Sequence, residues 1–162
     1  MGTLRRATPE DAEDLTRLRG LMHLSMGTPS LPEEWRVACV EEFRRRLERD
    51  DFVAYGVDVD GRLVSCGAGW IEHHLPSPTQ HDGRRGHIAS MSTDPEWMRR
   101  GFAREVFGGL LGWFAEQGVA RIDLRATEMG RPLYEQHGFR VLGGATMAWT
   151  APGIAPGMPG RG

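Results

Sequence analysis

Lysine is the residue type whose absence says most about this chain. The 162 residues include 20 basic side chains, and all of them are arginine. An enzyme that forms a Schiff base through a lysine amine is therefore excluded. A P-loop nucleotide hydrolase is excluded as well, because its motif G-x-x-x-x-G-K-S/T requires the lysine. No G-x-G-x-x-G follows an expected strand either, which argues against a nucleotide-dependent redox enzyme.

Cysteine and clustered metal ligands are also scarce. Cys39 and Cys66 are the only cysteines and form no C-x-x-C pair. Their setting is typical of reduced core residues, although one disulfide between them stays open. His73 and His74 are adjacent on an expected strand and so point to opposite faces, which prevents them from sharing an ion. With no other ligand cluster, we predict no metal.

Long hydrophobic runs are missing. The first residues, Met1 to Arg6, lead directly into polar sequence without an apolar signal region, and no apolar run reaches membrane-spanning length. We therefore expect a cytoplasmic protein without a membrane partner. The net charge of −2 argues against a chain built to bind nucleic acid.

The hydrophobic spacing predicts alternating helices and strands. Thr8 as N-cap and Pro9 at the first helical position begin a helix that continues past Met22. Further helices are expected over about 32–48, 100–117 and 131–137. Asp60-Gly61 predicts a tight hairpin turn, and 75–86 reads as a loop. Strands are expected over 3–7, 52–59, 62–72, 87–93, 121–126, 139–142 and 146–150.

This order, β-α-α-β-β-β-α-β-α-β-β, predicts a single α/β domain over residues 1–150. Its sheet should be mixed and mostly antiparallel, with about seven strands and about four flanking helices. The crossover from strand 87–93 through helix 100–117 to strand 121–126 should be parallel and right-handed. Residues 151–162 are rich in Pro and Gly and predict a loose tail.

The start of that crossover carries the chemistry. The run Met98-Arg99-Arg100-Gly101-Phe102-Ala103-Arg104 joins a strand end to a helix start. Backbone N–H groups at a helix N-terminus lack helical partners, and the helix dipole is positive there, so such a turn binds anions. Gly101 permits close approach of a ligand, Ala103 keeps the next turn narrow, and the arginines add positive charge. Together they suit a pyrophosphate.

In this turn the chain resembles the GNAT superfamily of Gcn5-related N-acetyltransferases, whose signature is Gln/Arg-x-x-Gly-x-Gly/Ala. Met98 departs from the signature, while Gly101 and Ala103 match it. The segment Leu133-Tyr134-Glu135-Gln136-His137-Gly138-Phe139 also looks like the family's L-Y-E-x-x-G-F segment. Thr127 stands where the family often has Asn. The resemblance implies the GNAT fold, acetyl-CoA as co-substrate and acetyl transfer to a primary amine.

The resemblance also implies site residues. Arg99, Arg100, Gly101, Phe102, Ala103, Arg104 and Thr127 would bind the cofactor, and backbone N–H groups at Met91, Ser92 and Thr93 would face the thioester oxygen. Tyr134 would protonate the departing thiolate. Glu72 is the expected base, with His73, His74 and His87 as alternatives.

The acceptor should lie among the connection 27–32, the loop 75–86, Trp35 and Trp70. Acidic residues (Glu72, Asp82 and Glu128) hint at a cationic acceptor, and a small-molecule amine is favoured. A protein N-terminus or lysine as acceptor, and a non-catalytic acyl-CoA sensor, stay open as alternatives. The terminal strands and the tail could pair two copies into a homodimer.

Overall fold

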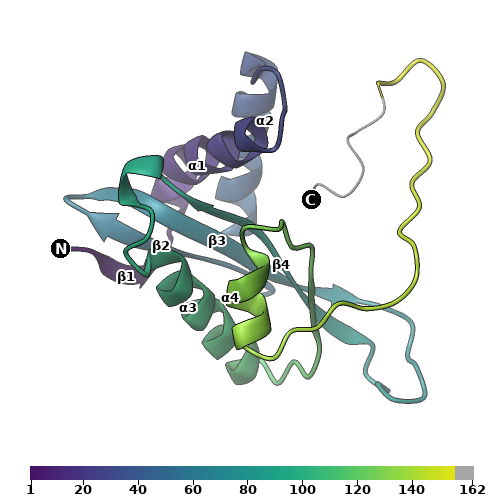
Figure 1. Ribbon diagram of the computed structural model, residues 1–162. Helices are drawn as coiled ribbons and strands as arrows, with labels where there is room; N and C mark the ends of the chain where they lie inside the picture. The colour runs from purple at the N-terminus through teal and green to yellow at the C-terminus, as the bar shows by residue number, and fades with distance from the viewer. Residues whose placement is uncertain (156–162) are drawn as a thin grey trace. The chain divides into compact units, whose positions relative to one another are not determined.

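Five strands form one sheet in the order β1-β2-β3-β4-β5 (Figure 1). The computed structural model describes residues 1–155. Strands β1 (Thr3–Arg6), β2 (Phe52–Val59), β3 (Arg62–His73) and β4 (Arg84–Thr93) pair antiparallel in succession. β5 (Ile122–Leu124) pairs parallel with β4, which confirms the predicted parallel crossover. Asp60 and Gly61 both have positive φ, 52° and 83°, and form the predicted hairpin turn between β2 and β3.

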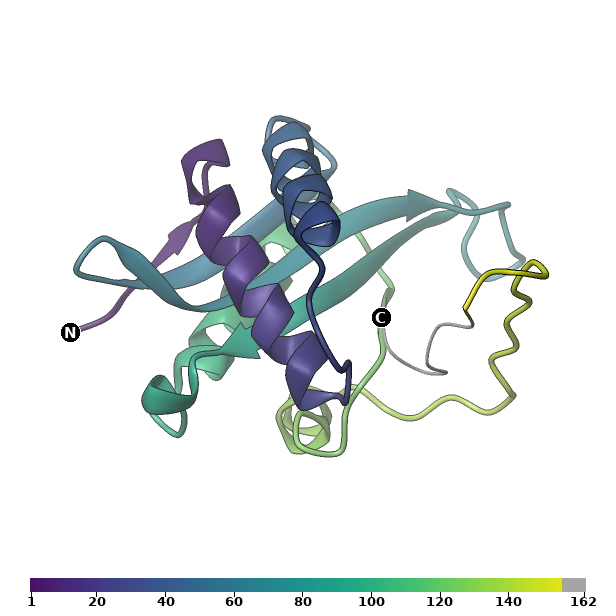
Figure 2. The same ribbon diagram turned by 90° about the horizontal axis from the view of Figure 1, so that it is seen from above.

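Helices cover both faces of this sheet (Figure 2). α1 (Ala12–Ser25) and α2 (Glu33–Arg46) lie on one face, and α3 (Phe102–Glu116) lies on the other. Short 3-10 helices, η1 (Pro9–Asp11) and η2 (Pro95–Trp97), precede α1 and α3. No helix in the described part of the chain combines the length and the apolarity that a membrane span requires.

The chain divides into two compact units. The first, Met1–Leu124, holds the sheet with α1, α2 and α3. The second begins at Arg125 and holds α4 (Arg131–Gln136).

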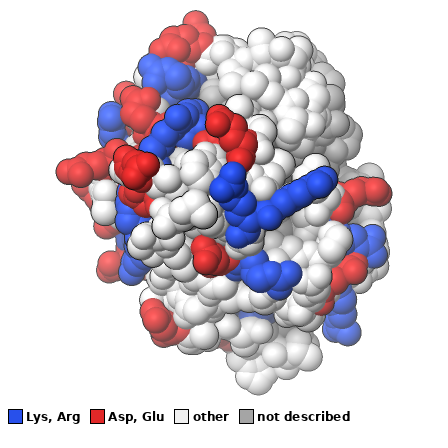
Figure 3. Space-filling view, turned by 60° about the vertical axis from the view of Figure 1, so that its left-hand side comes forward, with Lys and Arg blue, Asp and Glu red and all other residues white. Residues whose placement is uncertain are grey.

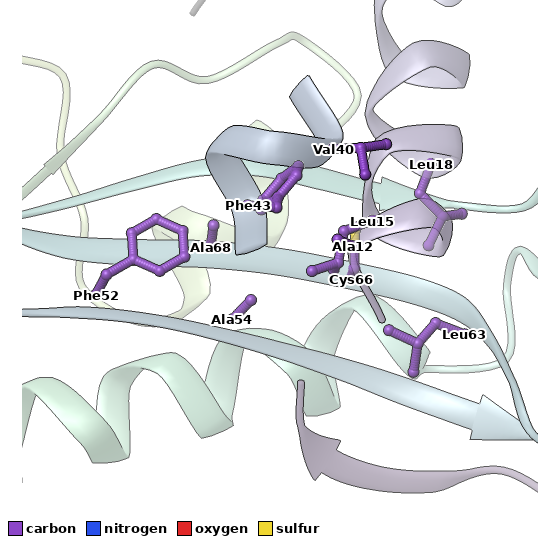
Figure 4. Close-up of a cluster of buried hydrophobic side chains, with 10 residues drawn as sticks. All are labelled: Ala12, Leu15, Leu18, Val40, Phe43, Phe52, Ala54, Leu63, Cys66 and Ala68. Carbon is purple, nitrogen blue, oxygen red and sulfur yellow. The ribbon is translucent and has the colours of Figure 1, made fainter. Parts of the chain in front are cut away.

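The α1/α2 face of the sheet is closed by small and large apolar side chains in alternation. Short residues on the strands, such as Ala54, Cys66 and Ala68, leave room for the side chains of Leu15, Leu18, Val40 and Phe43 from the helices. All ten residues drawn in Figure 4 belong to this buried cluster. Each fully buried Leu or Phe contributes on the order of 2 kcal/mol, so this face is one of the two that hold the unit together.

Glycines let α3 approach the opposite face closely. A Cβ atom on Gly86 would lie 2.6 Å from the ring of Phe114, and one on Gly69 would lie 3.0 Å from the same ring. The buried stripe of α3 (Phe102, Val106, Phe107, Leu110, Trp113 and Phe114) has the spacing of one helical face. Because α3 packs so tightly on the strands, its N-terminus is held in a fixed relation to the end of β4.

The expectation of about seven strands was wrong. Residues 139–150 contain no strand, although 139–142 and 146–150 were both expected to form one. Val141 and Trp149 are 71% and 83% exposed. A strand persists only where a neighbour accepts and donates its backbone hydrogen bonds, and within the described residues this segment has no such neighbour.

Two further boundaries differ from expectation. β4 begins at Arg84, inside the predicted loop, because the β3–β4 hairpin continues to the pair His73 and Arg84. Of the predicted tail, residues 151–155 form a turn, and residues 156–162 lie outside the described part of the chain.

Candidate active site

The connection from β4 to α3 is an exposed turn with two left-handed residues. After η2, Met98 is extended, Arg99 has φ of 62° and Gly101 has φ of 81° at the N-cap position. A Cβ on Gly101 would meet nothing within 4 Å, so a ligand can approach the backbone there. A left-handed arginine costs free energy, which indicates that the turn is held by its surroundings.

The N-terminus of α3 offers unpaired backbone donors. The Glu105 amide donates to the carbonyl oxygen of the N-cap residue Gly101 at 3.1 Å. The amides of Phe102 and Ala103, in the first turn, therefore have no acceptor in the helix, and no side chain caps it. These donors and the positive end of the helix dipole suit an anion.

The side chains of this turn divide into anchors and surface cations. The guanidinium of Arg100 lies 4.6 Å from the centre of the Trp97 ring, which stacks on Phe102 at 6.1 Å. Phe102 is buried, so its side chain anchors the turn and only its amide faces a ligand. Arg99, Arg100 and Arg104 are exposed, and Met98 is 45% exposed. Figure 3 shows that basic side chains gather near the centre of one face, with acidic ones around them.

β4 and β5 part after three pairs of residues. The last pair joins Ile88 to Leu124, while β4 continues to Thr93. Asp94 N donates to Val64 O at 2.8 Å, on the β3 side. Because successive amides of a strand point to opposite edges, the N–H groups of Met91 and Thr93 point to the edge that β5 leaves uncovered. An open edge with free-pointing backbone N–H groups thus runs toward the N-terminus of α3.

A bulge interrupts β4 at this opening. Ala68 pairs with Ala89 but Cys66 pairs with Ser92, so Gly67 alone faces Ser90 and Met91. Ser90 has φ of 60° and is 4% exposed. Bulges of this kind bend a strand and redirect its amides. The bulge is centred on Ser90.

The hydroxyl groups next to the bulge are used by the fold. Ser92 Oγ donates to Leu18 O at 2.7 Å, and Thr93 Oγ1 shares a 2.8 Å hydrogen bond with Ser65 Oγ. The Met91 side chain lies over Gly67, on the α3 face. At the open edge these residues consequently offer backbone N–H groups, those of Met91 and Thr93, whereas the Ser92 N–H points toward β3.

Tyr134 and Thr127 belong to the second unit. Tyr134 is 8% exposed, and burial raises the pKa of its phenol above the ordinary value. Its ring packs near Phe139, at 6.4 Å between centres. Thr127 Oγ1 accepts a hydrogen bond from Gly130 N at 3.1 Å, which shapes the turn before α4. Burial thus favours the neutral form of the Tyr134 phenol, and the Thr127 hydroxyl has a structural contact.

Comparison with known proteins supplies the family. The family model described as "Acetyltransferase (GNAT) family" matches residues 19–139. The chain belongs to this family. It is an acetyltransferase by membership, and enzymes of the family use acetyl-CoA. None of the curated proteins matches the chain significantly.

Solved structures share the fold. A predicted acetyltransferase with acetyl-CoA from Clostridium acetobutylicum is 23% identical, with a TM-score of 0.79 over 93% of this chain and 95% of that one. A GCN5-related N-acetyltransferase from Ralstonia eutropha JMP134 is 24% identical, with a TM-score of 0.77 over 92% and 99%. Glucosamine-6-phosphate N-acetyltransferase from Arabidopsis thaliana is 19% identical, with a TM-score of 0.71 over 93% and 99%.

Within this GNAT fold, Glu72 lies away from the bulge. Glu72 pairs with Arg85, five positions along β3 from Gly67, or about 17 Å at the usual rise of a strand. Its carboxylate accepts hydrogen bonds from Trp70 Nε1 at 3.2 Å and pairs with His74 Nε2 at 2.9 Å. Burial acts to raise the pKa of Glu72, but the bonds from His74 and Trp70 outweigh it and hold that pKa below its ordinary value. These two contacts favour the charged form of the Glu72 carboxylate and hold it beside Trp70.

A cavity of about 180 Å³ opens on the α1/α2 face beside the bulge. It is lined by residues of α1, α2 and the three central strands (Arg19, Cys39, Glu42, Phe43, Arg46, Phe52, Ala68, Trp70 and Ser90). Trp70 was expected here, whereas Trp35 packs against Gly20 and edge-on to His23. Arg19, Arg46 and Ser90 were not predicted, because helical spacing does not tell which arginines lean toward a strand.

His73, His74 and His87 do not form a metal site with neighbours. Among the residues that the structure describes, no group of three or more His, Cys, Asp or Glu is placed to hold an ion. His87 instead lies against Trp70, with 4.8 Å between the ring centres, and so belongs to the aromatic wall beside the cavity.

Proposed function

We propose that this chain transfers the acetyl group of acetyl-CoA to a primary amine of a small molecule, by direct attack in a ternary complex. The observation that carries the proposal is the bulged, open edge of β4 that leads to the uncapped N-terminus of α3. A chain of the acetyltransferase family with this edge has both a place for a pyrophosphate and a place for a thioester.

The residues present fit acetyl-CoA. Amides of Phe102 and Ala103 would hold the pyrophosphate, with Gly101 leaving the approach open and the exposed Arg99, Arg100 and Arg104 beside it. The N–H groups of Met91 and Thr93 along the open edge would hold the pantetheine arm and the thioester oxygen. Bound acetyl-CoA supplies the activated acyl group.

The chain's own residues then have three tasks. The amide at Met91 stabilises negative charge on the thioester oxygen as the amine nitrogen bonds to the carbonyl carbon. Tyr134 gives its phenolic proton to the sulfur as the carbon–sulfur bond breaks. The acceptor ammonium first loses one proton to solvent, because only the neutral amine can attack. After attack the nitrogen loses a second proton, which passes through water to the Tyr134 phenolate and restores the phenol. Neither cysteine forms an intermediate: burial raises the pKa of the Cys66 thiol to about 12, and direct attack needs no nucleophile from the protein.

Two observations support a small-molecule acceptor: the size of the cavity and the substrate named for one protein of similar structure. A volume of about 180 Å³ corresponds to about six water molecules in the liquid. The Arabidopsis neighbour acts, by its name, on glucosamine-6-phosphate. We also propose that the protein acts in the cytoplasm and that two copies pair as a homodimer.

The test is release of CoA from acetyl-CoA across a panel of small amines, peptides with free N-termini and lysine peptides. We expect release with small amines, and Tyr134→Phe should lower turnover by at least about tenfold while the affinity for CoA stays within about twofold. Equal turnover of the two proteins would remove Tyr134 from the mechanism. Preference for peptides would replace the small-molecule acceptor, and binding without release on every amine would identify a sensor.

A further inference from the structure

The cavity beside the bulge holds two polar features that the fold itself leaves unused. Ser90 is buried, and its Oγ has no hydrogen-bond partner. Its backbone is left-handed, at φ of 60°, which is a costly conformation for serine. A buried hydroxyl without a partner costs about 1–3 kcal/mol. A group that is both strained and unsatisfied, and that lines a cavity, indicates a contact with something that enters the cavity.

The second feature is Arg19. It lines the same cavity from α1 and is half-buried. In the part of the chain that the structure describes, no hydrogen bond or ion pair is formed by its guanidinium. Its neighbour on the same helix, Arg17, differs, because it binds Asp94 and the carbonyl of Leu63. Arg19 is thus the arginine of this helix that is left to meet a ligand.

The charge of the cavity wall is positive. Arg19 and Arg46 line it with a single acid, Glu42. Arg45 and Arg46 both bind the Glu42 carboxylate, each at 2.6 Å, and their hydrogen bonds lower the pKa of that carboxyl to about 2. Glu42 is therefore neutralised by two arginines, and an ammonium group at this wall would meet uncompensated positive charge.

The remaining wall is aromatic. Phe52 and Trp70 stack with 6.0 Å between their ring centres, and the guanidinium of Arg46 lies over both, at 5.9 Å and 5.7 Å. Contact with these rings holds Arg46 in place, so it can bind an anion with little loss of side-chain freedom. The cavity thus has a cationic side, an aromatic side and a polar base at the bulge.

We propose that the acceptor is a small amine that also carries a carboxylate or a phosphate. Its anionic group pairs with Arg19 and Arg46, its carbon skeleton lies on Phe52 and Trp70, and its amino group is held by Ser90 Oγ beside the open edge of β4. This inference rests on the proposed acetyl transfer and names its substrate class. It replaces the cationic acceptor that the acidic loop residues suggested, and it disfavours lysine side chains, which would bring a second positive charge to this wall.

The experiment compares matched acceptors. CoA release is measured for amino acids and amino-sugar phosphates, each beside its decarboxylated or dephosphorylated partner. We expect kcat/KM to be at least about tenfold higher for the anionic member, since a charge-assisted pair is worth about that factor. Comparing the amino acids with the amino-sugar phosphates then shows whether the enzyme prefers a carboxylate or a phosphate. Higher kcat/KM for neutral amines in both arms would overturn the inference, while release itself would leave the acetyltransferase function in place.

Substitutions in the cavity wall then test whether its charged residues cause the preference for anionic amines. Arg19→Gln should lower the ratio of anionic to neutral kcat/KM by about tenfold, and Glu42→Gln should raise it. Arg36→Gln is the matched control, because Arg36 is an exposed α2 arginine bound to Glu33 and Glu13 outside the cavity. An unchanged ratio in both Arg19→Gln and Glu42→Gln would overturn the inference, and Glu42→Gln keeps the test valid if Arg19→Gln fails to fold.

Measuring the affinity for the amines tests the inference independently of turnover. Calorimetric titration of the wild-type protein, with CoA present, should detect the anionic amines and show weaker binding to Arg19→Gln. Absence of binding by every anionic amine would contradict the inference directly. Binding of the anionic amines without CoA release from acetyl-CoA would support it and would instead contradict the proposed acetyl transfer.

Discussion

The guanidinium of Arg17 donates a 2.8 Å hydrogen bond to the carboxylate of Asp94, where β4 ends and the turn before α3 begins. Arg17 also donates to Leu63 O at 2.7 Å, so one side chain joins α1, β3 and the turn. The Asp94 side chain is 12% exposed, which shields the pair from solvent. α1 thereby fixes the start of the segment that presents the α3 amides.

Breaking this pair should loosen the turn. Asp94→Asn keeps the shape but removes the charge, and we expect the free energy of unfolding to fall by about 1–3 kcal/mol, the usual worth of a hydrogen bond between charged groups. The dissociation constant for CoA should rise severalfold, because the α3 amides are then less well placed. Urea unfolding and calorimetric titration measure the two effects.

Arg36→Gln serves as the control, since its ion pairs are exposed and should contribute less than about 1 kcal/mol. If Asp94→Asn unfolds at the same urea concentration as the wild type, Asp94 is not a support of the turn.

Ser90→Ala should separate stability from activity. Removing a buried hydroxyl without a partner should raise the free energy of unfolding by about 1 kcal/mol. The same change should lower kcat/KM for the acceptor by about tenfold, because the amino group loses its contact. A gain in stability with a loss of activity is the signature of a residue retained for function.

Thr16→Val is the matched variant, because Thr16 Oγ1 is the other buried hydroxyl without a partner among the described residues, and it does not line the cavity. It should gain stability without losing activity. Equal activity of Ser90→Ala and the wild type would show that the hydroxyl has no role in the reaction.

Met98→Arg should tighten the complex with acetyl-CoA. Met98 is exposed beside the α3 amides, and an arginine there restores the residue type that the family signature usually carries. We expect the KM for acetyl-CoA to fall severalfold at low salt, with the gain shrinking as ionic strength rises. Leu75→Arg places the same charge at an exposed residue of the β3–β4 connection, at the other end of β4, so an equal gain in both variants would mean a general charge effect.

The two cysteines should differ in reactivity. The pKa of the buried Cys66 thiol is raised to about 12 by burial, so its thiolate is almost absent at pH 8, whereas Cys39 is half-buried and lines the cavity. Iodoacetamide on the folded protein should modify Cys39 alone, as seen by mass spectrometry, and should block turnover while CoA still binds.

In Cys39→Ser, the reagent should leave the activity at its untreated level. Modification of Cys66 in the folded protein, or loss of activity in treated Cys39→Ser, would contradict this account of the cavity.

Much of the first unit could be predicted because its signals are local. The stripe of α3 and the Asp60-Gly61 turn each depend on residues a few positions apart, and each was confirmed. The prediction of the final strands was wrong for the opposite reason. Short apolar runs such as 139–142 and 146–150 specify a strand only together with a neighbour, and that neighbour is not a property of the run.

The sequence by itself determined the turn at the start of α3, since Gly101 and the helix that follows dictate which backbone amides lack helical partners. Only the tertiary structure decided which side chains surround the place of reaction. Pairing of β3 with β4 created the bulge that turns Ser90 into the cavity and put Glu72 about 17 Å from it, and packing of α1 and α2 brought Arg19 and Arg46 to one wall. Helical and strand periodicity fix the face that a residue occupies, whereas the register between distant elements fixes what it meets.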